Sequence, residues 1–467
     1  MISNNSGRHN VLLLTSEFPP VANAGVQRPL YFAKYLPRFG WKPLVLTVKE
    51  VMHFAYDHSL LGMLPPETAV HRTETLELRR MLWILRRFTG RAATNGTAAT
   101  NGTAVKEAPK QTREFRLNPR WRELGRKVRG WLFVPDDRVL WMPFAIVRAL
   151  QLKRTDPFDI VFATVPVYSV GVTAFIISKL TGIPLVIDLR DAWTGDPYDQ
   201  GPTLLHRKLS KALEGATLRH AAKIIVICDD MKRFLLQRYP EFSPEKIVVI
   251  TNGFDRQEFD SAEAVETEGR FVVAYSGALY AHHAPSFSVF CRAWSAACRQ
   301  DPEFAERAEL WVVGRVDPEI RGIADDTENL KATFFGYQPH TTAIRYLVSA
   351  NLLLLLIKNL RPEDLDSVIT IPGKAWEYLA SGTPTLMIGP EGDASRIIRD
   401  AGGSVYNEEC VNEIAAELLR RFKQFRQDPN PATNFSAERL RYDRESLTSD
   451  LARELNGVCG LDRAYSA

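Results

Sequence analysis

Short β-branched apolar runs alternate with amphipathic helical patterns along most of this chain, and this alternation constrains the fold more than any other feature. Strand-like runs in the first half cover residues 11–15, 44–48, 160–165, 185–188, 223–227 and 247–250. Helical patterns cover residues 29–39, 167–180 and 204–219. In the last of these, Leu205, Leu209, Leu213 and Ala216 are spaced to share one buried face. Such alternation is typical of a parallel sheet covered by helices on both faces.

The same rhythm starts again after a polar stretch at residues 257–269. The later strand-like runs cover residues 271–275, 309–313, 333–335, 352–356 and 384–388, and the length of 467 residues suits two domains. We therefore predict an α/β fold with two Rossmann-like domains (residues 1–260 and 261–435) whose parallel sheets face each other across a ligand-binding cleft. A helix in residues 436–467 is expected to pack back on the first domain.

One uncharged stretch of nineteen residues, 160–178, is long enough to be considered as a membrane span. It contains Pro166, Gly171 and several hydroxyl side chains. We therefore predict a buried strand, a proline turn and a helix there instead. The first ten residues show no signal-peptide pattern and the five cysteines lack Cys-x2-Cys spacing. Both features predict a cytoplasmic protein with reduced thiols.

Positive charge is concentrated in an insertion at about residues 50–156. Residues 79–129 hold fourteen Lys or Arg against three Glu, whereas the net charge of the whole chain is only +4. Segments 76–88 and 120–133 combine Trp, Leu and Phe with Arg, which suits a helix in an anionic membrane interface. The same composition suits a helical hairpin that only covers the sheet. A six-residue repeat at 92–97 and 98–103 predicts a mobile loop near residues 91–112.

The loop after the first strand excludes several function classes. A dinucleotide-binding enzyme would have Gly-x-Gly-x-x-Gly there, but the loop at residues 16–25 contains Pro19 and Pro20 and ends on Gly25. The chain has neither a Walker loop nor His-Glu-x-x-His. We expect no nucleic-acid partner, because no stacking platform or recognised nucleic-acid module is present.

The sequence around residue 373 predicts a phosphate-binding helix. Pro372 and Gly373 open a helical pattern, and the free amides of a helix start can hold a diphosphate. Lys374 adds a cation in the first turn. Glu377, one turn later, is placed to accept hydrogen bonds from ribose hydroxyls. Gly382 then ends the helix.

A series of motifs resembles glycosyltransferase family 4, the retaining GT-B group. In chain order they lie at residues 19–25, 184–193, 251–255, 275–279, 312–315, 335–337 and 371–384. The turn Thr251-Asn252-Gly253-Phe254-Asp255 and the last motif are the most specific of them. The form Pro-x-Lys-x-x-Glu-Tyr in the last motif is similar to the branch that transfers amino- or deoxy-sugars in bacterial surface polysaccharide assembly.

This resemblance implies a set of functional residues. Catalytic roles fall to Arg190, Asp191 and Lys374. Donor-binding roles fall to Glu377, Gly373, Ser276, Gly277, Arg315, Tyr337, Thr370 and Ile371. Acceptor or phosphate contacts fall to Gly25, Arg28 and His283. Asp191 is expected to act as a base or to orient the acceptor, and the alternative for it is a structural ion pair with Arg190.

The chain departs from the family pattern at three places. Ile369 stands where the first Glu of the usual pair would be, and Ala278 and His283 replace an Arg and a Lys. Lys374, the helix amides and His283 or Arg315 would then have to neutralise the leaving diphosphate. Asp364-Leu365-Asp366 spells a metal-binding motif, but it lies in a polar loop after a proline, and we expect neither a metal nor another cofactor.

The predicted function is therefore transfer of a sugar, with retention, from a nucleoside-diphosphate sugar to a hydroxyl acceptor. The resemblance implies a metal-independent enzyme of the hexosyltransferase type, cytoplasmic or at the inner face of the cell membrane, whose acceptor is a lipid-linked glycan of surface polysaccharide biosynthesis. Two alternatives share the fold: a UDP-sugar 2-epimerase and a non-catalytic scaffold.

Overall fold

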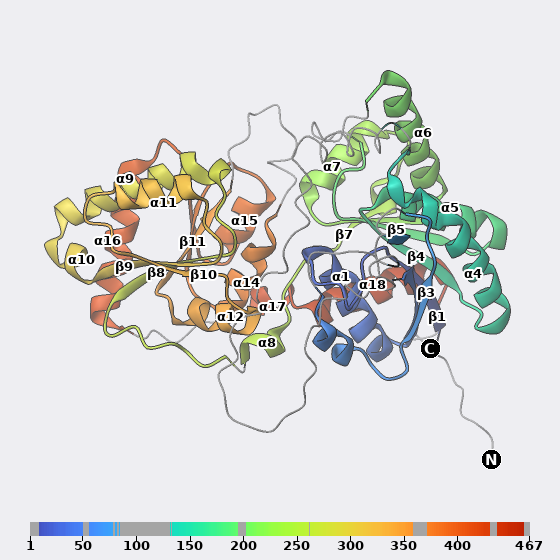
Figure 1. Ribbon diagram of the computed structural model, residues 1–467, viewed down its shortest axis with the longest axis horizontal. Coiled ribbons are helices and arrows are strands. Elements are labelled where there is room, and N and C mark those ends of the chain that lie inside the picture. Colours follow the sequence, from blue (N-terminus) through green and yellow to red (C-terminus); the bar gives the residue numbers. More distant parts are fainter. Residues whose placement is uncertain are drawn as a thin grey trace, which may run out of the picture. The chain divides into compact units, whose positions relative to one another are not determined.

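The computed structural model describes residues 9–49, 56–77, 133–194, 202–260, 262–357, 371–429 and 437–461, together with single positions between residues 80 and 131. The chain divides into two compact units: residues 1–224 with 455–467 form unit 1, and residues 225–454 form unit 2. In each unit helices cover both faces of a sheet (Figure 1). The sequence-based expectations for residues 364–370, for the repeat and for most of the two basic segments lie outside the described residues.

The first sheet has seven described strands in the order β3-β2-β1-β4-β5-β6-β7. Its strands are β1 (His9–Leu14), β2 (Trp41–Val48), β3 (Ala69–Thr73), β4 (Ile160–Val165), β5 (Leu185–Leu189), β6 (Lys223–Val226) and β7 (Ile247–Val249). Strand β1 lies inside the sheet and pairs in parallel with β2 and β4, so that Leu12 is opposite Leu44 on one side and Val161 on the other. These central strands are apolar on both faces because helices cover both of them.

The connections of the first sheet are mostly helical. They are α1 (Ala24–Tyr35), η1 (Leu36–Phe39), η2 (His58–Met63), η3 (Asp137–Trp141), α4 (Met142–Thr155), α5 (Tyr168–Thr181), α6 (Leu204–His220), α7 (Asp229–Arg238) and η4 (Pro244–Lys246). Strand β4 and helix α5 confirm the prediction of a strand, a proline turn and a helix in residues 160–180. No helix among the described residues is both long enough and apolar enough to cross a membrane.

The second sheet has six described strands in the order β10-β9-β8-β11-β12-β13. They are β8 (Phe271–Ser276), β9 (Ala308–Val313), β10 (Ala332–Gly336), β11 (Leu352–Leu356), β12 (Thr385–Ile388) and β13 (Ser404–Tyr406). Each of these strands pairs with its neighbours in parallel. The chain therefore builds outward from β8 to one edge, returns to β11 beside β8, and builds to the other edge. This is the order of a doubly wound Rossmann sheet.

Helices again connect the strands of the second sheet, and others precede its first strand or follow its last one. They are α8 (Arg256–Asp260), η5 (Ala281–His283), α9 (Ala284–Gln300), α10 (Pro302–Arg307), α11 (Pro318–Asp325), α12 (His340–Ser349), α14 (Gly373–Ser381), α15 (Asp393–Asp400), α16 (Val411–Gln427), α17 (Ala437–Leu440) and α18 (Arg444–Cys459). Helices α9 and α11 lie on one face of the sheet, and α12 and α14 lie on the other (Figure 1). Under α9, the rings of Phe271, Trp294, Phe304 and Phe422 pack edge to face or tilted. These aromatic contacts hold α9, α10 and α16 to the sheet.

Three features of the fold differ from the sequence-based expectation. The insertion at residues 50–156 contains two parts of the fold itself, because β3 pairs with β2 at the sheet edge and α4 packs on α5. Strand β13 was not predicted. Both missed strands are edge strands of only partly buried residues, so they lack the continuous apolar run by which a central strand is recognised.

The buried face of α6 is also not the predicted one. Leu205 is 73% exposed and Leu209 is 47% exposed, while Gly215, Thr217 and Leu218 are buried. The prediction was wrong because the longer run of leucines on this helix faces solvent, whereas a shorter set of residues near the end of the helix packs against the core. The exposed stripe begins at Leu204, which is 68% exposed.

Candidate functional site

The carboxyl ends of β8 and β11 mark the point where the second sheet reverses its winding. In open α/β sheets the loops at such a point leave a crevice in which ligands bind. The loop after β8 begins with Gly277, whose φ of 109° is a left-handed conformation that favours glycine. Gly314, after β9, approaches so closely that a Cβ on it would lie 2.1 Å from the carbonyl oxygen of Gly277. Two glycines therefore let the two loops lie against each other beside the crevice.

Lys374 lies directly over this pair of loops. It is the second residue of α14, and its ammonium nitrogen lies 4.1 Å from the centre of the Tyr275 ring and donates a hydrogen bond to the Tyr275 hydroxyl. A Cβ on Gly277 would lie 3.7 Å from the Lys374 Nζ. Burial lowers the pKa of Lys374 to about 8, and nearby Glu377 opposes that shift. The ammonium group therefore remains mostly charged at neutral pH although it is largely removed from water.

Tyr378 fixes the helix that carries Lys374 to the sheet. Its buried hydroxyl accepts a hydrogen bond from the backbone N–H of Ser276 at 2.8 Å and donates one to the carbonyl of Leu354 at 3.2 Å. Gly373, the first residue of α14, is exposed, and Ile371 before it is buried. The start of α14 is thus anchored from below with its first residue open to solvent, as phosphate binding at a helix N-terminus requires.

Glu377 lies one turn after Lys374, and its side chain is one-third exposed. Its Oε1 lies 3.8 Å from Nδ1 of His340, at the start of α12. His340 Nε2 in turn lies 3.0 Å from Oε2 of Glu258, on α8. Burial raises the pKa of Glu377, and the positive charges of His340, Arg444 and Lys374 oppose that rise. The sequence analysis found Glu377 but missed Glu258, His340 and Arg444.

The remaining predicted donor residues in unit 2 lie at the ends of its strands. Ser276 is buried at the end of β8, Arg315 is exposed after β9, and Tyr337 after β10 is 85% exposed. His283 is buried, its Nδ1 lies 3.2 Å from the backbone nitrogen of Tyr280, and burial together with Lys374 lowers its pKa to about 4. His283 is therefore neutral at pH 7, and it supplies no positive charge for a diphosphate. Thr370 lies outside the described residues.

In unit 1 the predicted residues Arg190 and Asp191 follow the carboxyl end of β5, and Gly25 is the second residue of α1. Arg190 is buried and donates hydrogen bonds to the carbonyls of Gly25 (2.6 Å), Val165 (3.3 Å) and Pro166 (3.0 Å). Its guanidinium therefore holds the start of α1. Asp191 is exposed. This geometry gives Arg190 a positioning role. The role of Asp191 as a base or in orienting the acceptor stays a prediction.

Arg28, expected to contact acceptor or phosphate, is instead buried on α1. Its Nε and Nη2 donate to both oxygens of Asp188 at 2.8 to 3.1 Å. Asp188 is fully buried and also accepts a hydrogen bond from Thr164 at 2.7 Å. The guanidinium joins α1 to β4 and β5, which is a structural role. No local pattern indicated this pairing, because the two residues lie in different motifs.

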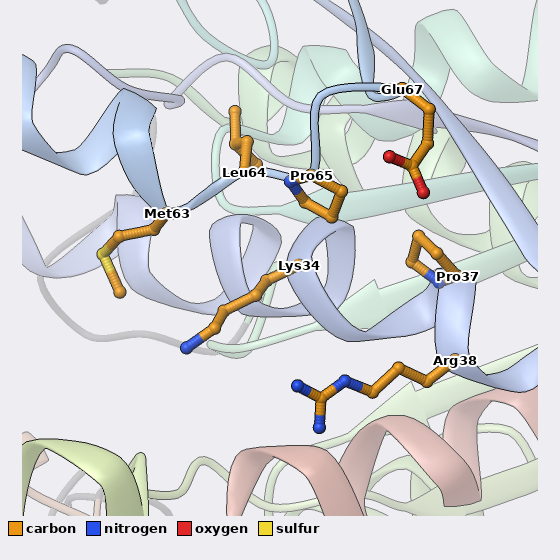
Figure 2. Close-up of a pocket in the computed structure, with 7 residues that line it drawn as sticks. All are labelled: Lys34, Pro37, Arg38, Met63, Leu64, Pro65 and Glu67. Carbon is orange, nitrogen blue, oxygen red and sulfur yellow. The ribbon is translucent and has the colours of Figure 1, made fainter.

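Two cavities lie away from these residues. The larger, of about 470 Å³, is in unit 1 beside α1, and Figure 2 shows the residues that line it: Lys34, Pro37, Arg38, Met63, Leu64, Pro65 and Glu67. The smaller, of about 280 Å³, is in unit 2 and is lined in part by Cys228, Asp393, Arg396 and Tyr442. None of the predicted site residues lines either cavity except Ile371, which borders the smaller one.

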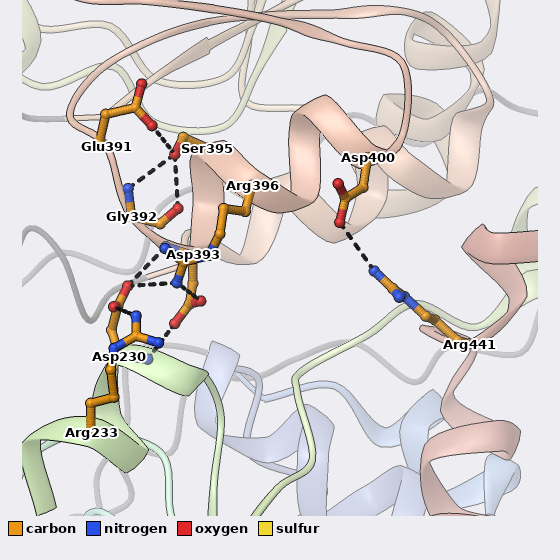
Figure 3. Close-up of polar contacts among 9 residues, drawn as sticks. All are labelled: Asp230, Arg233, Glu391, Gly392, Asp393, Ser395, Arg396, Asp400 and Arg441. Atoms are coloured by element: carbon orange, nitrogen blue, oxygen red, sulfur yellow. Dashed lines mark hydrogen bonds and ion pairs between the residues drawn. The ribbon is translucent and has the colours of Figure 1, made fainter.

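Asp393, which lines the smaller cavity, forms a reciprocal pair with Asp230 (Figure 3). The backbone N–H of Asp230 donates to Asp393 at 2.6 Å, and that of Asp393 donates to Asp230 at 2.9 Å, so that each carboxylate caps the helix of the other. Arg396 contacts both carboxylates. Burial opposes ionisation of Asp393, but the Asp230 amide and Arg396 hold its pKa below the ordinary value. This arrangement fixes the start of α7 to the start of α15.

Among the described residues, no three His, Cys, Asp or Glu side chains converge as a metal site would require. The Asp364-Leu365-Asp366 motif lies outside them.

Comparison with known proteins agrees with this architecture. The structure is similar to a glycosyltransferase from Rickettsia africae (TM-score 0.57, 14% identity, covering 97% of this chain and 98% of that one). It is also similar to Anabaena HepE in complex with UDP-glucose (TM-score 0.55, 14% identity, 96% and 99%). A third likeness is to a putative UDP-N-acetylglucosamine 2-epimerase from Listeria monocytogenes (TM-score 0.52, 11% identity, 97% and 96%). With its two parallel α/β units, the chain is a protein of the GT-B fold.

A more specific match concerns the N-terminal half. Residues 97–253 match the family model described as a glycosyl transferase 4-like domain. The matched residues lie mainly in unit 1 and extend into unit 2. No significant match is found among curated protein sequences.

Proposed function

We propose that this protein is a glycosyltransferase that moves a sugar from a nucleoside-diphosphate sugar to a hydroxyl acceptor. The observation that carries the proposal is the start of α14, where Lys374 and Glu377 lie one turn apart and Lys374 lies over the carboxyl end of β8. The exposed helix start and the Lys374 ammonium suit a diphosphate, and the Glu377 carboxylate suits the hydroxyls of a ribose. The glycosyltransferase 4-like domain in residues 97–253 supports the same reaction class.

The proposed chemistry is transfer with retention and without a metal. The bond between the anomeric carbon and the diphosphate oxygen breaks, the acceptor oxygen bonds to the same face of that carbon, and the proton of the acceptor hydroxyl passes to the departing diphosphate. Negative charge develops on the leaving diphosphate, where Lys374 and the amides at the start of α14 are already positioned. Fixed charge of this kind stabilises a transition state without reorganisation and is often the largest single contribution to catalysis.

Binding of the donor is the first test. A thermal-shift panel of UDP-glucose, UDP-N-acetylglucosamine, GDP-mannose, ADP-glucose and dTDP-glucose should contain at least one sugar nucleotide that raises the melting temperature, because a ligand that binds only the native state stabilises it. We expect Glu377→Ala to weaken that donor about tenfold or more, since a hydrogen bond to a charged group contributes about 1.5 to 3 kcal/mol.

Glu319→Ala is a suitable control, because Glu319 is an exposed carboxylate on α11. The donor proposal would be abandoned if no sugar nucleotide shifted the wild-type melting temperature, or if Glu377→Ala bound the donor as tightly as Glu319→Ala. Incubation with UDP-N-acetylglucosamine and no acceptor tests the alternative, because a 2-epimerase would release the epimerised sugar.

We further propose that the acceptor is lipid-linked, as in the assembly of surface polysaccharides, and that the protein works at the inner face of the cell membrane. Leu204, Leu205 and Leu209 on α6 are exposed, and the exposed Trp131 contacts His206 between them with ring centres 5.5 Å apart. Trp131 belongs to the second basic segment, so apolar side chains adjoin a part of the sequence rich in arginine. Apolar groups flanked by cations are the combination that binds an anionic bilayer surface.

Liposome binding should follow from this surface. We expect the protein to co-sediment with vesicles containing phosphatidylglycerol, and expect added salt to weaken this binding. The triple variant Leu204→Ser, Leu205→Ser, Leu209→Ser should reduce the bound fraction about tenfold or more, since each buried leucine contributes about 1.5 to 3 kcal/mol when removed from water. Val147→Ser is the control, because Val147 is a comparably exposed apolar residue on α4. Equal binding to neutral and anionic vesicles would contradict the proposal.

A further inference from the structure

We infer that His340, held by Glu258, positions the carboxylate of Glu377 for the ribose of the donor and makes donor binding depend on pH. The inference rests on the proposed function and adds to it a residue pair that lies outside the family motifs. It concerns three side chains from three helices, α8, α12 and α14, which pack on one another in unit 2.

Geometry gives His340 two carboxylate neighbours on opposite sides of its ring. Nε2 is 3.0 Å from Glu258 Oε2, and Nδ1 is 3.8 Å from Glu377 Oε1. Each ring nitrogen therefore faces a different carboxylate. The Nε2–Oε2 distance is that of a hydrogen bond, whereas the Nδ1–Oε1 distance is too long for one, so the ring acts on Glu377 through its charge. Only the protonated ring carries that charge.

Glu258 favours the protonated form of the ring. Its hydrogen bond is the main reason why the pKa of His340 is raised above the ordinary value of 6.5, and Glu377 adds to the rise, while burial and Arg444 oppose it. The start of α12 also opposes it, because a helix N-terminus disfavours a cation. His340 is the first residue of that helix. The two glutamates therefore outweigh three unfavourable influences.

Every charged group that faces Glu377 comes from an element packed around it. They are Lys374 on the same helix, His340 on α12, Glu258 on α8 and Arg444 at the start of α18. Arg444 Nε is already engaged, because it donates to the carbonyl of Gly253 at 3.0 Å. Lys374 contacts Tyr275 and lies over the loop proposed for the diphosphate. His340 is thus the cation best placed to orient the Glu377 carboxylate itself.

The sign of the pH effect follows from the raised pKa. Below that pKa the ring is charged, Glu377 is held and donor binding is strongest. As the pH rises through the pKa of His340, the ring loses its positive charge, and it no longer holds the Glu377 carboxylate for the donor. Loss of the Lys374 charge near pH 8 weakens binding separately, so the wild type should lose affinity in two steps.

The test is isothermal calorimetry with UDP and UDP-glucose on the full chain between about pH 6 and pH 9, a range that begins near the ordinary pKa of a histidine and extends past the pKa of Lys374. His340→Gln should weaken binding about two- to fivefold at the acid end of that range and remove the step that belongs to His340, because a half-exposed ion pair contributes little more than that. His340→Lys, which keeps a charge over the range, should restore tight binding without the His340 step. Glu258→Gln should move the His340 step to lower pH while leaving the step of Lys374 in place.

Controls separate this inference from the proposed function. His58→Gln changes an exposed histidine of unit 1 and should leave the whole profile unchanged. Melting temperatures of each variant without ligand show whether it is folded. If wild type binds but His340→Gln and Glu258→Gln keep the wild-type profile, the role of His340 is refuted and the proposed function stands. If wild type binds no nucleotide of the panel at any pH, both are refuted.

Discussion

Lys374→Met should lower the rate of sugar transfer about a hundred- to a thousandfold, which is the usual cost of removing one fixed group that stabilises developing negative charge. Methionine is close to lysine in length and remains apolar where lysine packs on the Tyr275 ring, so the local structure should survive. What is lost is the positive charge that the structure places over Tyr275 and Gly277. Release of nucleoside diphosphate from the donor found in the thermal-shift panel measures the rate.

The pH dependence gives the same prediction a second readout. Burial lowers the pKa of Lys374 to about 8. Because the charged form is the one that attracts a diphosphate, wild-type donor affinity should fall as the pH rises through that value, and Lys374→Met should show no such fall. Lys331→Met is the matched control, since Lys331 is exposed and precedes β10 at the opposite end of the sheet. A Lys374→Met variant with wild-type turnover would remove the charge-stabilisation mechanism.

The elements that could be predicted from the sequence are those whose signals lie within the element itself or next to it. Central strands such as β4 and β11 carry continuous apolar runs, and the helix at residue 373 has a proline before it and Gly382 in a left-handed conformation after it. These signals need no tertiary information. They sufficed for the fold class and for the placement of Lys374 and Glu377 on one helix at the crevice.

The features that could not be predicted from the sequence depend on contacts between residues that are far apart in the chain. The face of α6 that is buried is decided by the neighbours of Gly215 and Leu218, so the longer leucine stripe misled the prediction. A lone histidine in the sequence did not indicate a functional role for His340. The role is inferred only from the fold, which places Glu258 and Glu377 near its two ring nitrogens. In the same way Arg28 resembled a phosphate ligand until the fold placed it against Asp188.

Removing Asp188 should destabilise unit 1 by about 3 to 5 kcal/mol, because Asp188→Ala leaves the buried charge of Arg28 without its carboxylate. Arg28 is 7% exposed and Asp188 is fully buried, so water cannot replace the lost partner. For a domain of this size such a loss corresponds to a fall of about 6 to 20 °C in melting temperature. Calorimetric melting of the full chain measures it, and the transition of unit 2 is expected to change less.

The double variant Arg28→Met, Asp188→Leu separates a structural from a functional role of Arg28. Replacing both members of a buried ion pair by apolar residues of similar size is often nearly neutral for stability. We therefore expect the double variant to recover most of the melting temperature lost in Asp188→Ala. If Arg28 serves only the fold, sugar transfer should recover with it. A double variant that melts like the wild type but fails to transfer sugar would mean that the guanidinium also contacts the acceptor or its phosphate, and that its pairing with Asp188 positions it for that contact.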